Sequence, residues 1–250
     1  MSRPFALSLI FLVALGAFLV AGLPLSTALG MLEARERGLD YESASGTVWR
    51  GSIHGARLAN QDVGEVDVAL SSAGLARGVA ELQFQSRGAL RARGVLSAGL
   101  GGAVELSDAT LVADARDLGR LHPDLAARGG EFFVRLDEAA FDLRGGCARA
   151  SGVVQSDVLA RGGGSTGWRG PALEGAISCT DGSLTVALSG AEEGTAVSID
   201  AMLNARSGTR VFADVSTENP EVAAALAYLG FVENESGFSY AYQSRQDTAS

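Results

Sequence analysis

Residues Glu65–Leu70 read EVDVAL and residues Ala80–Gln85 read AELQFQ, and in both stretches apolar and polar side chains alternate one by one. Successive side chains of a strand point to opposite faces, so a period of two gives each strand one apolar face and one wetted face. The two stretches therefore predict β-strands that each bury one side only.

The same alternation returns along most of the chain, separated by residues that favour turns. Asp181-Gly182 is the strongest of these turn signals, because Asp-Gly is typical of two-residue hairpin loops. The chain contains 33 glycines and only 5 prolines, which fits many turns between short elements. The further alternating stretches are Val104–Leu106, Leu111–Ala113, Phe132–Asp137, Phe141–Arg144, Ile177–Cys179, Leu184–Leu188, Val197–Ala201, Val211–Val215 and Phe238–Tyr242.

Among these strands, only two segments have helical features. Asn219–Leu229 starts with Asn219 as N-cap and Pro220 at the first helical position, whereas Asp117–Ala127 is interrupted by Pro123. Parallel strands need a crossover connection between them, usually a helix, so most of these strands must pair antiparallel. The sequence predicts a mainly β fold, a curved antiparallel β-meander sheet of about ten strands with one or two short helices. A closed barrel or a sandwich is the alternative.

The N-terminal stretch Phe5–Leu23 reads FALSLIFLVALGAFLVAGL and carries no charge. As a helix it would be roughly 28 Å long, close to the hydrocarbon thickness of a bilayer. We therefore expect a transmembrane anchor with the N-terminus in the cytoplasm and the bulk of the chain exported; a cleaved secretory signal is the alternative. The residues expected to face lipid are Phe5, Leu9, Phe11, Leu12, Leu15, Phe18, Leu19 and Leu23.

The expected domain organisation follows from this anchor. Residues 1–32 form the cytoplasmic tip and transmembrane helix, residues 33–44 a charged juxtamembrane connector, and residues 45–246 an exported β domain, followed by a disordered tail at 247–250. Because strands lead to a helical segment twice, the β domain is expected to divide into halves at 45–127 and 128–246.

Composition argues against several classes of function. The chain has a formal net charge of -9, and its 20 basic residues show no basic run, so it does not favour nucleic-acid binding. The sequence lacks a nucleophile elbow, a P-loop and a dinucleotide-binding fingerprint. We expect a protein that is not an enzyme and uses no cofactor, metal or small-molecule substrate.

Cys147 and Cys179 are the only cysteines. An even number of cysteines in an exported domain favours a disulfide, with two separately buried thiols as the alternative. The only histidines, His54 and His122, do not stand at zinc-ligand spacing from either cysteine, and each is expected to be a surface or capping residue.

The segment Ser45–Gly51, SGTVWRG, is the most distinctive motif. We expect Val48 and Trp49 to lie in a strand bracketed by glycines. A tryptophan buries up to about 250 Å² of mostly apolar surface, so Trp49 is expected as a core anchor or as a partner-docking residue. Trp168 has the same two alternatives, in a glycine-rich loop.

The TVWRG element of this motif, beyond a single apolar N-terminal stretch and followed by glycine-punctuated strands, resembles the type II secretion system protein N family (GspN family). Further pieces fit this family: Leu118–Pro123 (LGRLHP), the stretch Gly130–Leu136, Trp168 with Pro171, and Leu173–Leu188. The resemblance implies a non-enzymatic, single-pass subunit of the bacterial cell inner membrane with most of its chain in the periplasm. The implied partners are the other inner-membrane platform subunits, and the implied role is to assist export of folded proteins across the outer membrane.

A second hypothesis uses the same alternation differently. The apolar face of a curved sheet has the chemistry to bind or conduct lipid acyl chains, and an envelope protein with this anchor would have lipid at hand.

Overall fold

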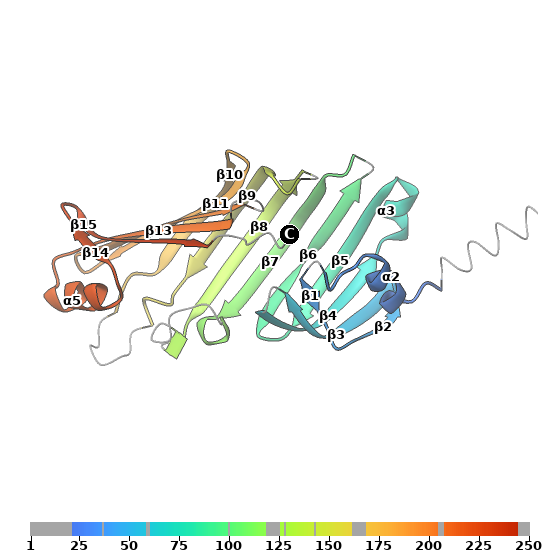
Figure 1. Ribbon diagram of the computed structural model, residues 1–250, viewed down its shortest axis with the longest axis horizontal. Coiled ribbons are helices and arrows are strands. Elements are labelled where there is room, and N and C mark those ends of the chain that lie inside the picture. The colour runs from blue at the N-terminus through green and yellow to red at the C-terminus, as the bar shows by residue number, and fades with distance from the viewer. Residues whose placement is uncertain are drawn as a thin grey trace, which may run out of the picture.

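The computed structural model describes residues 22–36, 38–58, 61–99, 101–118, 126–127, 129–142, 144–161, 169–204 and 208–244. They form a single antiparallel sheet of 15 strands (Figure 1). The strands are β1 (Leu39–Asp40), β2 (Ser43–Thr47), β3 (Arg50–Leu58), β4 (Gln61–Leu70), β5 (Val79–Arg87), β6 (Leu90–Gly99), β7 (Val104–Asp114), β8 (Glu131–Phe141), β9 (Cys147–Ser156), β10 (Leu173–Thr180), β11 (Ser183–Glu192), β12 (Thr195–Asn204), β13 (Gly208–Thr217), β14 (Val232–Asn234) and β15 (Gly237–Ser244).

The strand order is almost the order of the sequence. From β3 to β13 each strand pairs with the next, β1 and β2 both pair with β3, and β14 pairs with the outer side of β15. The two ends of this order do not pair with each other among the described strands, so the sheet is open. The predicted antiparallel meander is confirmed, although it has 15 strands and not about ten, and the alternatives of a closed barrel or a sandwich are wrong for the described strands.

Hairpin turns set much of the register. Asp181 and Gly182 both have positive φ, 51° and 74°, as the predicted Asp-Gly turn requires. Glu193 and Gly194 repeat this geometry in the next hairpin, with φ of 47° and 75°. These two-residue turns connect β10 to β11 and β11 to β12 as tight hairpins.

Bulges explain where the sequence periodicity changes phase. On β7, Asp108 has a φ of 49° and the register shifts opposite it, between Arg93 and Val95 of β6. On β8 the register to β9 shifts between Leu136 and Glu138. Each bulge adds one residue, so apolar side chains on both sides of it stay on the same face of the sheet.

Three α-helices and one 3-10 turn lie among the described residues: α2 (Leu25–Met31), α3 (Ser72–Ala76), α5 (Pro220–Tyr228) and η1 (Ala115–Asp117). The predicted C-terminal helix is confirmed as α5, whose N-cap side chain, Asn219 Oδ1, accepts a hydrogen bond from the Glu221 N–H at 2.9 Å. Of the predicted helix Asp117–Ala127, residues 119–125 lie outside the described residues; Asp117 ends η1, and Ala126 and Ala127 are helical.

The expected anchor also lies almost wholly outside the described residues. Phe5, Leu9, Phe11, Leu12, Leu15, Phe18 and Leu19 are not described; Leu23 is half-buried and its carbonyl accepts a hydrogen bond from the Val48 N–H. None of the helices in the described part of the chain has the length and apolar character needed to cross a membrane. Pro24 forms an isolated bridge with Thr47, so the chain is extended here, and α2 begins at Leu25.

Two strand boundaries differ from expectation. Val48 and Trp49 lie in the turn between β2 and β3, so the strand expected there is wrong. The expected strand Phe141–Arg144 is also wrong, because β8 ends at Phe141 and the Asp142 carboxylate caps a turn by accepting the Arg144 and Gly146 N–H groups, each at 2.8 Å.

The core consists of three clusters on one face of the sheet. At the N-terminal end, Leu25 and Leu29 of α2 pack against Ile53 and Val68. At the C-terminal end, Val222 and Leu226 of α5 pack among residues of β10, β12 and β13. The middle cluster is built from strand residues alone: Leu136, Ala139, Val154 and Ile177.

Candidate interaction surfaces

The face that holds the three clusters, here called the inner face, is continuous across the sheet. The register aligns Val68 with Phe84, Leu111 with Val134, and Val134 with Val154. The same alignment continues through Ile177 and Val186 to Ala213 and Tyr240. Apolar side chains therefore run side by side from β4 to β15.

The inner face carries almost no charge. Along the paired positions from Val66–Leu70 of β4 to Phe238–Tyr242 of β15, Glu192 at a hairpin end is the only ionisable acid or base among the described positions apart from the tyrosines. Its other polar members are small hydroxyls, and the buried Ser86 hydroxyl is satisfied by the Leu90 carbonyl at 2.7 Å. This face is suited to apolar contacts only.

Helices cover the inner face at its two ends but not in the middle. The middle cluster is bordered by half-buried Leu106, Val134, Phe141 and Leu188, and no described helix packs on it. Leu96 and Leu203 on this face remain 37% and 42% exposed. The strands β6 and β12, which flank the middle cluster, thus leave apolar side chains that the described part of the chain does not cover.

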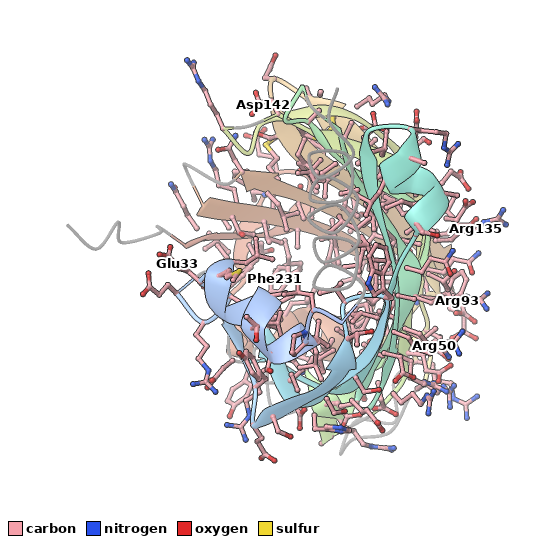
Figure 2. All side chains as sticks on the ribbon, turned by 90° about the vertical axis from the view of Figure 1, so that its right-hand side faces the viewer. Glu33, Arg50, Arg93, Arg135, Asp142 and Phe231 are labelled. Atoms are coloured by element: carbon pink, nitrogen blue, oxygen red, sulfur yellow. A yellow bond between two sulfur atoms is a disulfide. The ribbon has the colours of Figure 1, made fainter. Side chains whose placement is uncertain are left out.

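The opposite face, here called the outer face, is polar. Figure 2 shows Arg50, Arg93 and Arg135 projecting from the outside of the curved sheet. Asp67 of β4 accepts a hydrogen bond from Ser52 Oγ at 2.6 Å and forms an ion pair with Arg87 of β5. The outer face is therefore hydrated and carries both signs of charge.

Arg149 connects three neighbouring strands on the outer face. From β9 its guanidinium reaches Glu105 of β7 at 2.5 Å and Glu138 of β8 at 3.2 Å. Hydrogen bonds from Arg149 to Glu138, and then to Glu105, raise the pKa of the guanidinium above its ordinary value. Exposed ion pairs of this kind add little to the stability of a fold. Their main effect is to make the outer face charged and polar.

A hollow of about 580 Å³ lies on the outer face, between β3 and β7. Its walls include Arg50, Asp67, Arg93 and Asp108, two cations and two carboxylates. This balance of charge does not select a ligand of either sign. No group of three or more His, Cys, Asp or Glu side chains suited to a metal ion occurs within the described ranges.

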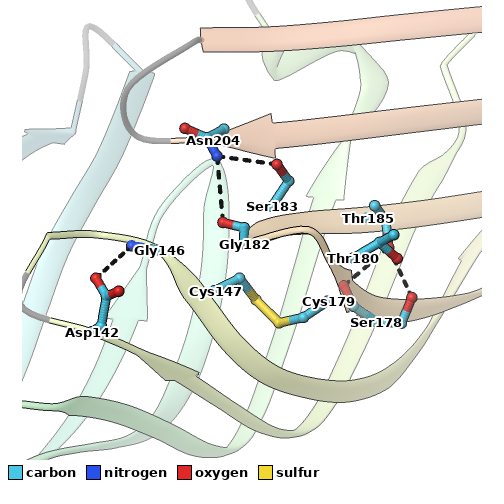
Figure 3. The surroundings of a disulfide bond; sticks show 10 residues. All are labelled: Asp142, Gly146, Cys147, Ser178, Cys179, Thr180, Gly182, Ser183, Thr185 and Asn204. Carbon is cyan, nitrogen blue, oxygen red and sulfur yellow. Dashed lines mark hydrogen bonds between the residues drawn. A yellow bond between two sulfur atoms is a disulfide. The ribbon is translucent and has the colours of Figure 1, made fainter.

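The disulfide lies where β9, β10 and β11 meet (Figure 3). Cys147 starts β9 and Cys179 lies near the end of β10, with Cα atoms 5.7 Å apart. The β9–β10 register stops at the pair Gly152 and Ile177, and beyond it the Cys147 N–H donates to the Gly182 carbonyl at 2.9 Å. The bond therefore links strands at a point where their regular pairing has ended.

The other residues singled out by the sequence are scattered. Trp49 is half-buried in the β2–β3 turn, and Trp168 and His122 lie outside the described residues. His54 of β3 lies 3.6 Å from Glu65, with nearly half of its side chain exposed, as expected of a surface residue. Neither Trp49 nor His54 joins the disulfide or the middle cluster.

The two edges of the sheet are protected differently. Beside β3, the short strands β1 and β2 are backed by α2 and by the Pro24 bridge. On the outer side of β15, β14 pairs only with Gly237–Ser239. Within the described chain, Tyr240–Ser244 have a strand on one side only.

Sequence reasoning did not single out Arg149 or the β15 edge. A cross-strand ion pair depends on register, which the bulges on β7 and β8 change by a residue. The edge position of β15 follows from β14 folding back after α5, and three residues of β14 give no alternation to detect.

Comparison with known proteins identifies the family. The model of the family described as type II secretion system (T2SS), protein N, matches residues 37–240, the larger part of the chain and nearly all of the sheet. Searches of curated proteins and of solved structures gave no match. The chain belongs to the type II secretion system protein N family and is thus a component of that secretion system.

Proposed function

We propose that this protein is a non-enzymatic inner-membrane subunit of the type II secretion system, anchored by Phe5–Leu23, with its sheet in the periplasm. There it assists the export of folded proteins across the outer membrane by docking other inner-membrane platform subunits. The family match over residues 37–240 is the observation that carries the proposal.

Two features of the chain support the periplasmic location. The Cys147–Cys179 disulfide is of the kind that persists in oxidising compartments such as the periplasm. The uncharged stretch that precedes α2 has the length and composition of a membrane-spanning helix.

The edge of β15 is the proposed docking surface. Tyr240–Ser244 have no described strand on their outer side, and an extended segment of a partner adds readily to such an edge through backbone hydrogen bonds. The polar outer face beside it favours a partner segment with polar side chains on that face. The opposite edge, covered by α2 and the Pro24 bridge, is less accessible.

Photo-crosslinking in cells that carry the complete secretion system tests the docking. A photoactivatable residue at Gln243, on the edge strand, is expected to give adducts with inner-membrane platform subunits, since directly opposed Cβ atoms on paired strands lie about 5 Å apart. The same residue at Met202, on the outer face of β12, is the control, because Met202 lies in register with Gln243 but on a strand that is paired on both sides. Equal adducts at both positions, or adducts with no secretion subunit, would contradict edge docking.

Membrane topology needs a separate test. Alkaline phosphatase fused after Ser250 is expected to be active only if the sheet lies in the periplasm, and the intact mass of the purified protein should still include residues 1–23. An inactive fusion overturns the periplasmic location, and a mass lacking that segment overturns the anchor in favour of a cleaved signal.

A further inference from the structure

We propose that the inner face of the sheet is a binding groove for the acyl chains of membrane lipids. The proposal goes beyond secretion and rests on the proposed membrane attachment only for the supply of lipid. It is carried by the composition of the inner face, by its length, and by the place where the N-terminal apolar stretch reaches the sheet.

The chemistry of the inner face matches hydrocarbon. Leu106, Val134, Val154 and Val186 line its middle, with the charged groups of these strands directed to the outer face. A protein or nucleotide ligand brings polar groups that this face cannot pair, since buried polar groups need hydrogen-bond partners. An acyl chain requires none.

The inner face is open on both sides of the middle cluster. Leu96 of β6 and Leu203 of β12, which flank this cluster, are 37% and 42% exposed although both belong to the apolar face. No described helix covers the strands between the α2 and α5 clusters. A soluble domain usually buries such a face, so an apolar occupant explains why this one is retained.

The dimensions fit extended chains. Between the exposed residues Leu96 and Leu203 the sheet runs from β6 to β12 in one unbroken order. At about 4.8 Å between neighbouring strands, this part of the inner face extends roughly 29 Å. The acyl chains of one leaflet extend about 15 Å, half of the hydrocarbon core. This part of the face is therefore long enough for an extended acyl chain.

The N-terminal apolar stretch joins the sheet at one end of the inner face. Leu23 accepts a hydrogen bond from Val48, and Pro24 bridges Thr47, so the apolar stretch joins the sheet at the β2–β3 end. If Phe5–Leu23 spans the bilayer, that end of the inner face lies beside the lipid surface. Lipid from the bilayer then has only α2, which covers that end, between it and the open part of the inner face.

Photolabelling of the full-length protein tests the proposal. The protein is reconstituted in vesicles of phosphatidylethanolamine and phosphatidylglycerol in which a fraction of the acyl chains carry a diazirine. After irradiation, labelled peptides are expected from the inner-face residues of β6–β12, well outside residues 1–32. Unlabelled phospholipid in excess should reduce this labelling.

Neighbouring residues of β12 provide a matched pair of variants. Leu203→Glu places a carboxylate on the inner face and is expected to lower labelling of β6–β12 at least about tenfold, because a charge facing hydrocarbon is strongly disfavoured. Met202 is 37% exposed on the outer face, so Met202→Glu should leave labelling unchanged. Leu96→Glu and Val153→Glu, also on opposite faces and similarly exposed, repeat the comparison.

The outcomes distinguish lipid from other occupants of the inner face. Labelling confined to residues 1–32, or equal in Leu203→Glu and Met202→Glu, overturns the groove. Adducts between the groove and residues 1–32 of the same chain, or a partner protein crosslinked to Leu96, would show a different occupant and also overturn it. Purified protein and lipid suffice for the test, so its result is independent of whether secretion subunits dock at β15.

Discussion

Asp157 follows the last residue of β9 and ties it to the start of β8. Its carboxylate accepts hydrogen bonds from the Glu131 N–H and from Arg161 Nε, each at 2.7 Å. Partial burial alone would raise the pKa of Asp157, but the Glu131 hydrogen bond and the Arg161 cation together lower it below its ordinary value of 3.8. Asp157 therefore stabilises the fold in its ionised form.

We predict that Asp157→Asn lowers the free energy of unfolding by about 1 kcal/mol at pH 7, a modest value because the site is partly exposed to solvent. A group whose pKa is lowered on folding contributes above its unfolded pKa, and the contribution disappears as the pH falls through the folded pKa. The difference from wild type should therefore begin to fall near pH 3.8 and disappear as the pH drops through the lower folded pKa, which urea unfolding at pH 7 and at a series of acidic pH values will measure. Glu174→Gln, which removes a charge on β10 with no ion pair in the described structure, is the control; a difference that persists in acid would contradict the role of ionised Asp157.

At the scale of elements, the β10–β11 pair is held unusually close at Gly175. A Cβ atom at this position would overlap the backbone carbonyl oxygen of Ala187, and the φ of Gly175 is not positive. The glycine is thus required by the approach of the two strands and not by its own conformation.

Gly175→Ala is expected to destabilise the protein by about 2 to 4 kcal/mol, since the backbone must move to admit the methyl group. Gly99→Ala at the end of β6 meets no atom within 4 Å and should change stability by less than about 1 kcal/mol. Guanidinium unfolding of both variants measures the difference. If the two substitutions cost the same, the close approach of β10 and β11 is not a constraint on the fold.

The strands that the sequence predicts are those whose inner face is built from large side chains. The alternation Val66–Leu70 and Leu82–Phe84 became β4 and β5, whereas β9, with Ala150, Gly152 and Ser156 on its inner face, gave too weak a contrast. Small residues are sufficient there because the curved sheet brings neighbouring side chains over them. The period of two therefore reveals strands whose inner-face side chains are large. It misses strands, such as β9, whose inner-face side chains are small.

The features that could not be predicted depend on contacts between strands. Trp49 has a strand-forming side chain, yet it occupies the turn because β2 and β3 pair as a hairpin whose last pair is Thr47 and Arg50. The openness of the inner face is likewise a property of the register from β4 to β15. The sequence predicted the apolar face itself, but not that helices cover only its ends.

At the scale of the whole molecule, nearly all contacts between strands in the open meander join strands that are neighbours in the sequence. From β3 to β12 each strand pairs with both of its sequence neighbours, and the described helices α2 and α5 pack at the two ends. A chain built in this way can open locally without losing distant strands, as repeat proteins do. The disulfide adds a covalent link between β9 and β10, close to the turn that leads to β11.

Replacing both cysteines, Cys147→Ser with Cys179→Ser, is predicted to lower the free energy of unfolding by about 3.5 to 4 kcal/mol, as expected for a loop of this length in the chain-entropy model. Hydrogen exchange should show where this loss falls: amides of β9–β11 exchange faster, and those of β3–β5 keep their protection, because strand contacts are local. Dithiothreitol should reproduce the pattern in wild type and change nothing in the double variant. Equal loss of protection in β3–β5 and β9–β11 would instead mean that the 15 strands unfold as one cooperative unit.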